Sequence, residues 1–217
     1  MDREAFLSRV GRASLTSVLP ESPPTASALP EMPPADLLTL FRARAQSVHA
    51  VVHGPMSRHG VPRSVVGIAT GHGVTSFLAW DQLPASGVTA ALQSAGMDRV
   101  DHDVPDEDRQ RHQAEYVGVG LGVTGARAAL AESGTVVLVH GEGKPRMASL
   151  IPEVHVVLCE TDLLERNLAH WARQNPKLAG ETTNLVLVTG PSRTGDIEQQ
   201  LNLGVHGPRH LHIVMIK

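Results

Sequence analysis

Short apolar runs alternate with stretches of helical periodicity over most of the chain. From residue 64 onward the apolar runs are rich in Val, Ile and Thr, and several are apolar at nearly every position. The predicted strands cover residues 64–70, 98–102, 115–123, 134–140, 153–160, 184–190 and 211–216, and the predicted helices cover 85–96, 162–174 and 194–202. This alternation indicates an α/β fold with an open, mainly parallel sheet and helices on both faces.

The amino-terminal part of the chain departs from this pattern. Residues 2–13 carry apolar side chains at helical spacing, whereas residues 18–34 are proline-rich and predict an extended arm. A further helix is expected to begin near Pro34, because proline is favoured in the first turn. We therefore expect a helix and arm over residues 1–34 and an α/β domain over residues 35–217. Packing of the arm on a second copy, as in a homo-oligomer, stays open.

Composition narrows the classes of function. The 217 residues include 19 basic and 22 acidic side chains, and only 3% are aromatic, so neither the charge nor stacking surfaces favour nucleic acid. One cysteine, Cys159, can neither form an internal disulfide nor hold an iron–sulfur cluster, which indicates a cytoplasmic protein without such a cofactor. No apolar run is long enough to span a bilayer, so membrane insertion is not expected.

The first candidate site follows the apolar run of residues 184–190, which we expect to be a buried strand. Its residues are Gly190, Pro191, Ser192, Arg193 and Thr194. With Thr194 as the N-cap of the predicted helix 194–202, free backbone N–H groups and Arg193 would bind a carboxylate or phosphate at a carboxyl strand end. The alternative is a plain helix cap, in which the acidic side chains of the first turn satisfy the helix dipole without a ligand.

A second candidate is the hairpin predicted over residues 126–140, with Ser133 and Gly134 as its loop. This loop would place Glu132 opposite Thr135 and on the core side of its strand. Burial would raise the pKa of the Glu132 carboxyl and suit it to acid/base chemistry. The alternative is a glutamate at a hairpin tip in water.

Two glycine-rich stretches give further candidates. The stretch "GLGVTG", residues 120–125, matches the dinucleotide-binding pattern G-x-G-x-x-G and supports an alternative as an NAD(P)-binding oxidoreductase, although the segment after it is short for a crossover helix. In the stretch "TGHG", Gly71, His72 and Gly73 follow the predicted strand 64–70 and offer backbone N–H groups to an anion. A glycine turn without a ligand is the alternative there.

Histidine is frequent, with twelve residues, and His206, His210 and His212 fall close together near the carboxyl end. Zinc requires three or four converging ligands, and scattered imidazoles explain this count better. No metal site is expected.

Several segments together resemble one known family. The stretches "GVTGARAALAESGTVVL", "LIPEVHVVL" and "VTGPSRTGDIEQQLNLGVHGPRHLHIVMI" are similar to the lactate-utilisation (LUD) domain family, in its single-domain type C form, over roughly residues 117–217. Carried over to this sequence, the positions that the family marks are Glu132, Gly134, Thr135, Gly190, Pro191, Ser192, Arg193, Thr194, Asp196, Glu198, His206, Gly207 and Pro208. Ser133 and Gly195 depart from the threonine and alanine usual in the family, without loss of a reactive group.

The resemblance implies both a fold and a role. The implied fold is that of ribose-phosphate isomerase A, glucosamine-phosphate deaminase and the CoA transferases. The implied role is bacterial oxidation of L-lactate to pyruvate beside iron–sulfur partner proteins, which would hold the clusters that this chain lacks. Our main hypothesis is a small anionic ligand bound by Arg193 and the turn around it, with Glu132 as acid/base. The alternatives are a non-catalytic scaffold subunit and the NAD(P)-binding oxidoreductase.

Overall fold

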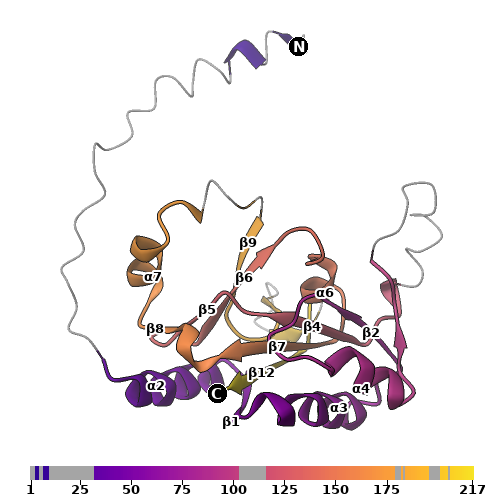
Figure 1. Ribbon diagram of the computed structural model, residues 1–217. Helices are drawn as coiled ribbons and strands as arrows, with labels where there is room; N and C mark the ends of the chain where they lie inside the picture. The colour runs from indigo at the N-terminus through magenta and orange to yellow at the C-terminus, as the bar shows by residue number, and fades with distance from the viewer. Residues whose placement is uncertain are drawn as a thin grey trace. The chain divides into compact units, whose positions relative to one another are not determined.

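The chain divides into two units, Met1–Glu31 and Met32–Lys217. A computed structural model describes residues 3–4, 7–9, 32–102, 116–178, 182, 184–195, 201–204 and 206–217 (Figure 1). The described residues of the first unit are helical, in agreement with the helix predicted over residues 2–13. No helix among the described residues is long and apolar enough to cross a membrane.

A six-stranded sheet forms the centre of the second unit, and every neighbouring pair in it is parallel. In spatial order its strands are β1 (Val51–Met56), β12 (His210–Ile216), β7 (Val154–Glu160), β4 (Leu121–Gly125), β2 (Ser76–Ala79) and β3 (Asp98–Arg99). Strands β4, β7 and β12 are buried along almost their whole length, as apolar runs covered on both faces require. The predicted α/β fold with a mainly parallel sheet is confirmed.

One face of this sheet is covered by two helices, α3 (Val61–Gly71) and α4 (Val88–Ser94), which lie side by side (Figure 1). The expected strand over residues 64–70 is wrong, because this segment lies within α3 and follows the short 3-10 turn η1 (Arg58–Gly60). Its buried residues Val61, Val65 and Ile68 recur at helical spacing, and Pro62 occupies the first turn. The β-branched residues of this segment favour a strand. The helical spacing of its buried residues and its packing on α4 favour the helix that is observed.

The other face carries a second sheet, which the sequence pattern did not predict. Its strands, in order, are β8 (Leu164–Glu165), β5 (Ala128–Leu130), β6 (Thr135–His140) and β9 (Asn184–Val188). Helices α2 (Pro34–Ser47) and α6 (Met147–Leu150) and this second sheet contribute side chains to one apolar core. On the outer side, Trp171 of α7 (Leu168–Gln174) packs on β5 and β6.

Two predictions in this region hold only in part. The hairpin over residues 126–140 forms, but its turn is longer than expected and pairs Leu130, not Glu132, with Thr135. The helix predicted over residues 162–174 begins only at Leu168, and the residues before it form η3 (Thr161–Leu163) and β8. Strand β9 is an edge strand with alternating exposure, so the expected buried strand there is wrong.

The helix predicted over residues 194–202 is also wrong. Strands β10 (Arg193–Gly195) and β11 (Leu201–Leu203) pair antiparallel, and Asp196 and Glu198 lie outside the described residues. The base of this ribbon is fixed by backbone bonds from Ser192 N–H to the Pro208 carbonyl (2.8 Å) and from Gly204 N–H to the Ser192 carbonyl (3.0 Å). These long-range bonds bring residues 193 and 203 opposite each other. The strand pairing that results is favoured over the helix that the local spacing of apolar residues predicts.

Candidate functional site

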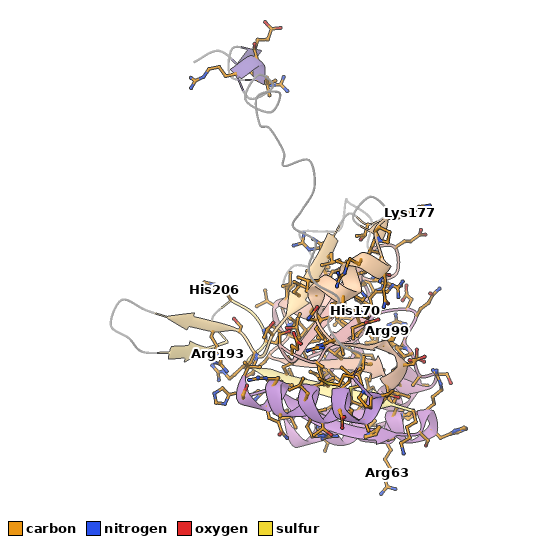
Figure 2. All side chains as sticks on the ribbon, turned by 90° about the vertical axis from the view of Figure 1, so that its left-hand side faces the viewer. Arg63, Arg99, His170, Lys177, Arg193 and His206 are labelled. Carbon is orange, nitrogen blue, oxygen red and sulfur yellow. The ribbon has the colours of Figure 1, made fainter. Side chains whose placement is uncertain are left out.

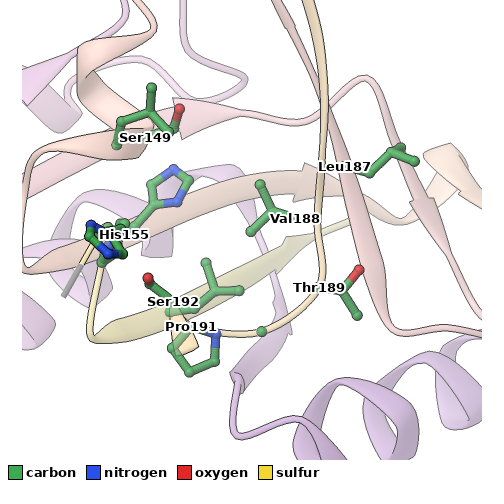
Figure 3. A pocket seen from close by; sticks show the side chains of 13 residues that line it. Ser149, His155, Leu187, Val188, Thr189, Pro191 and Ser192 are labelled. Atoms are coloured by element: carbon green, nitrogen blue, oxygen red, sulfur yellow. The ribbon is translucent and has the colours of Figure 1, made fainter. Parts of the chain in front are cut away.

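A cavity of about 190 Å³ lies between β9 and the starts of β7 and β12 (Figure 3). It is lined by Ser149, Leu150, His155, Leu187, Val188, Thr189, Gly190, Pro191, Ser192, His206, Gly207, Pro208 and Leu211. The cavity therefore brings together five predicted site residues, which come from the turn after β9 and the segment before β12. Since His155 and Leu211 are the second residues of their strands, the cavity lies at the amino edge of the parallel sheet, not at the expected carboxyl edge.

Helix α2 holds the turn after β9 in place. Gly190 has a φ of +78°, and a Cβ built there would lie 2.5 Å from the Val48 carbonyl oxygen at the end of α2. Only glycine adopts this conformation at such a distance from another backbone without strain. Close packing on α2 thus fixes where Pro191 and Ser192 face the cavity.

The turn between β5 and β6 adjoins this site. The Thr135 hydroxyl forms hydrogen bonds of 2.7 Å with the Ser133 and Thr189 hydroxyls, and Thr189 lines the cavity. Gly134, with a φ of +66°, packs so closely on α2 that a Cβ would lie 2.3 Å from the Ala45 nitrogen. Thr135 therefore lies next to the cavity wall and orients Thr189 through this hydrogen bond. Thr189 is a site residue that the sequence reasoning missed.

His155 is the most deeply buried polar residue of the cavity, with 1% of its surface exposed. Its Nε2 lies 3.0 Å from the Thr124 hydroxyl. None of the described residues forms a hydrogen bond with its Nδ1. Burial, and to a smaller extent the nearby His140, lowers the pKa of His155 to about 3, so the ring is neutral at pH 7. A neutral imidazole with a free nitrogen remains available to a ligand.

The sequence contained a signal for His155 that the motif search did not use. A polar residue inside the apolar run of residues 153–160, on the same face as Val157 and Cys159, must point into a core. Ser149 had no such signal, because α6 is a single short turn whose position depends on packing against β4.

Arg193 and Thr194, two residues of the predicted anion site, lie in strand β10. Arg193 is exposed at the start of β10 (Figure 2) and is not among the described residues that line the cavity, and Thr194 follows it in the same strand. No helix begins at Thr194, so the expected helix dipole and free N–H groups are absent from the described part of this turn. The predicted receptor built from Arg193 and a helix amino terminus is therefore wrong in its geometry.

Glu132 is exposed at the hairpin turn, contrary to the expected burial. Its carboxylate accepts hydrogen bonds from Arg166 Nε (2.7 Å) and Asn167 Nδ2 (2.9 Å). These two bonds, that from Arg166 first, lower the pKa of Glu132 instead of raising it. The residue does not line the cavity, and its carboxylate is held in its charged form.

Replacing Glu132 with glutamine is expected to change the free energy of unfolding by about 1 kcal/mol or less, because its ion pair with Arg166 is open to solvent. Urea denaturation at pH 7 measures the change. Glu153→Gln is the matched control, since Glu153 also forms an exposed pair, with Arg209. A loss of several kcal/mol on Glu132→Gln alone would show that the hairpin turn depends on this pair.

The expected anion cradle at Gly71, His72 and Gly73 does not form, because these residues end helix α3 instead of a strand. The backbone N–H groups of His72 and Gly73 donate to helix carbonyls, that of Gly73 to Thr70 at 3.0 Å. Regular helix termination thus consumes the donors that an anion would need.

Histidines do gather at this end of α3. His212 forms hydrogen bonds through Nδ1 with His53 (2.9 Å) and through Nε2 with His72 (3.0 Å), and the tilted ring of His210 lies 4.5 Å from that of His72, measured between ring centres. Because the two nitrogens of His212 face different partners, the rings form a chain and do not converge on one point. Among the described residues, no three potential ligands are arranged to hold a metal ion.

The stretch "GLGVTG" is not a phosphate-binding turn. Leu121–Gly125 is strand β4 and is buried throughout, so no helix amino terminus follows the glycines. A Cβ at Gly122 would lie 1.7 Å from the Ala148 carbonyl oxygen. The backbone of α6 can therefore pack this closely on β4 only because residue 122 has no side chain. The fingerprint prediction at this position is wrong, since its glycines serve packing.

The chain is similar in sequence to several known bacterial proteins. The chain is 39% identical over 103 residues to the uncharacterized protein NMB1437 of Neisseria meningitidis, covering 46% of this chain and 44% of that protein. It is 34% identical over 142 residues to a lactate utilization protein C of Shouchella clausii (63% and 60%) and 30% identical over 155 residues to one of Geobacillus sp. (67% and 64%). The chain thus covers less than two thirds of the length of these relatives.

A solved structure and a family model extend the comparison. The crystal structure of a DUF162 family protein from Deinococcus radiodurans matches with a TM-score of 0.63 and 22% identity, over 86% of this chain and all of that one, which shows a shared fold. The model of the LUD domain matches residues 38–216, the region that contains both sheets and the cavity between them. The chain therefore belongs to the LUD domain family.

Proposed function

We propose that this chain contributes to lactate utilisation, in the oxidation of L-lactate to pyruvate, by binding a small carboxylate in the cavity beside β9. Membership of the LUD domain family and the names of the relatives from Shouchella clausii and Geobacillus support the pathway. The observation that carries the ligand class is the lining of the cavity, which, among the described residues, combines hydroxyl and imidazole groups with apolar side chains and includes no carboxylate.

The lining matches the chemistry of a short hydroxy acid or keto acid. The hydroxyls of Ser149, Thr189 and Ser192 offer hydrogen bonds to carboxylate and hydroxyl oxygens. If the Thr124 hydroxyl donates to Nε2 of His155, the other nitrogen, Nδ1, carries the proton and donates to the ligand. Leu211, Val188 and Leu187 provide an apolar wall for a methyl group, and about 190 Å³ is room for a ligand of this size.

Calorimetric titration with L-lactate and with pyruvate tests this ligand assignment. Ser192→Ala and His206→Ala should each weaken binding about tenfold, because each removes a hydrogen-bonding group worth roughly 1.4 kcal/mol. His59→Ala is the matched control, as His59 is exposed in η1 and does not line the cavity. Equal affinity of wild type and both cavity variants, or no binding of either acid, would contradict the proposal.

The iron–sulfur partner proteins implied by the family resemblance form part of the same proposal. A chain that serves only as a scaffold for them would co-purify with these proteins and would bind neither acid. The titration therefore separates a ligand-binding subunit from a scaffold, and co-purification tests the partners independently.

A further inference from the structure

A second candidate site lies at the opposite edge of the parallel sheet, at the carboxyl ends of β2 and β4. A hollow of about 320 Å³ opens there. We call it the switch-point groove and define it by six of its lining residues: Trp80, Gln82, Pro84, Gly125, Arg127 and Lys144. Among the residues that the structure describes, it shares no lining residue with the cavity beside β9.

The topology of the sheet marks this edge as a place for a ligand. Strands β2 and β4 are neighbours, but the chain leaves β2 through α4 toward β3 on one side and leaves β4 through β5, β6 and α6 toward β7 on the other. The two connections cover opposite faces of the sheet, since α4 packs in one core and β5, β6 and α6 pack in the other. Such a reversal of direction opens a crevice outside the carboxyl ends of the two strands, where open α/β sheets bind ligands.

The charges of the groove favour an anion. Among the described residues that line it, Arg127 and Lys144 are the charged ones, and both are cationic. The neighbouring Asp81 is already paired with Arg99 (2.7 Å) and His102 (3.2 Å), and Glu160 is paired with Arg58. Glu142 lines the adjoining hollow, which shares Gln82 and Lys144 with the groove, and is not among the described residues that line the groove itself. An anion in the groove would therefore meet two cations without facing an unpaired Asp81 or Glu160.

The walls of the groove are held in place before any ligand binds. The Trp80 indole donates to the Pro145 carbonyl (3.2 Å), and Lys144 Nζ lies 5.8 Å from the centre of the Trp80 ring. Backbone bonds between Lys144 and Gly141 fix the turn that carries the lysine. Arg127 uses one guanidinium N–H for the Asn175 side chain (3.2 Å), which leaves further donors for a ligand. Preorganised groups of this kind lower the cost of binding.

From this arrangement we infer that the switch-point groove binds a small anion, a carboxylate or a phosphate ester, between Arg127 and Lys144. The apolar part of the ligand packs on Trp80, Leu83 and Val139, and Gln82 supplies a neutral hydrogen-bonding group. This site goes beyond the proposed carboxylate cavity and does not depend on it, because the two lie at opposite edges of the sheet.

The fluorescence of Trp80 tests this site. The chain has two tryptophans, and Trp171→Phe leaves Trp80 as the only one. Trp171 belongs to α7, packs on Ala128, Leu130 and Val137, and is not among the described residues that line the groove. In this background, titration with pyruvate, L-lactate and glycerol phosphate should give a saturable change in emission with at least one of them. The probe with the lowest Kd then distinguishes a carboxylate from a phosphate ester.

Variants assign the response to the groove. Lys144→Met and Arg127→Met, each in the Trp171→Phe background, should raise the Kd at least about tenfold, because each removes a charged hydrogen-bond donor. Arg63→Met is the matched control, since Arg63 is exposed on α3 and points away from the domain (Figure 2). Circular dichroism should show the same fold for all variants.

Two results would overturn the inference. One is the absence of a saturable response to all three probes up to about 10 mM. The other is a response that persists in both cation variants or disappears on Ser192→Ala, which would place the binding in the cavity beside β9. Loss of calorimetric binding at that cavity with an intact Trp80 response would leave this inference standing and remove only the proposed function.

Discussion

Replacing Gly122 with alanine is expected to lower the free energy of unfolding by about 3 kcal/mol or more. The added Cβ would lie 1.7 Å from the carbonyl oxygen of Ala148 and 3.1 Å from Cγ of Pro152. The first neighbour is backbone, which cannot rotate away as a side chain can. Strand β4 and helix α6 must therefore separate, and the core between the two sheets loses packing. Urea denaturation followed by circular dichroism measures the loss.

Gly67→Ala is the matched control for this substitution. Gly67 lies within α3, and a Cβ there would meet nothing within 4 Å. Alanine should stabilise the helix by about 0.5–1 kcal/mol, because glycine loses more backbone freedom on folding. Opposite signs for the two changes are the expected result. Unchanged stability of Gly122→Ala would show that α6 does not lie against β4.

Acid is expected to destabilise the protein through two buried histidines. Burial lowers the pKa of His155 to about 3 and that of His212 to about 4, where the neighbouring histidines His53, His72 and His210 also contribute. Both values lie below the ordinary value of about 6.5, so the unfolded chain takes up protons at a pH where the folded chain does not. Stability is therefore full above pH 6.5 and falls as the pH drops toward the folded values. Between pH 7 and pH 5 the loss should be about 2 kcal/mol for each of the two histidines.

Urea denaturation at several pH values between 7 and 5 measures this loss. In His155→Gln the slope of stability against pH should decrease, because one of the two proton acceptors is removed, whatever the stability of the variant at pH 7. His59→Gln, which changes an exposed histidine, should keep the wild-type slope. An equal slope for wild type and His155→Gln would mean that His155 takes up its proton over the same pH range in the folded and the unfolded protein.

The strands with an uninterrupted apolar pattern could be predicted from the sequence. β6, β7 and β12 were predicted because residues covered on both faces must be apolar at nearly every position. Segment 64–70 was assigned to the wrong class, because Val and Ile are common in strands and in buried helix faces, and four-residue spacing decides between them only when the partner is known. The helix predicted over residues 194–202 is wrong for a similar reason. The pairing of β10 with β11 depends on the backbone bonds of Ser192 with Pro208 and Gly204, which no local pattern shows.

The candidate site was predictable in its parts but not in its arrangement. Gly190, Ser192 and His206 were named from the sequence, and the structure places them on one cavity. The exposure of Glu132 followed from the register of the hairpin, which no local pattern contains. The burial of His155 could be read from its place inside an apolar run, but the residues around it come from distant segments.

By itself the sequence determined the α/β class, the mainly parallel sheet and the motifs that the LUD domain family shares, because each follows from residue period or residue identity within a short segment. The tertiary structure alone decided that a second sheet covers one face, that Thr135 meets Thr189, and that cavity and groove occupy opposite edges of the central sheet. These features arise from contacts between segments far apart in the chain, and such contacts form only when the apolar faces of all elements are buried together.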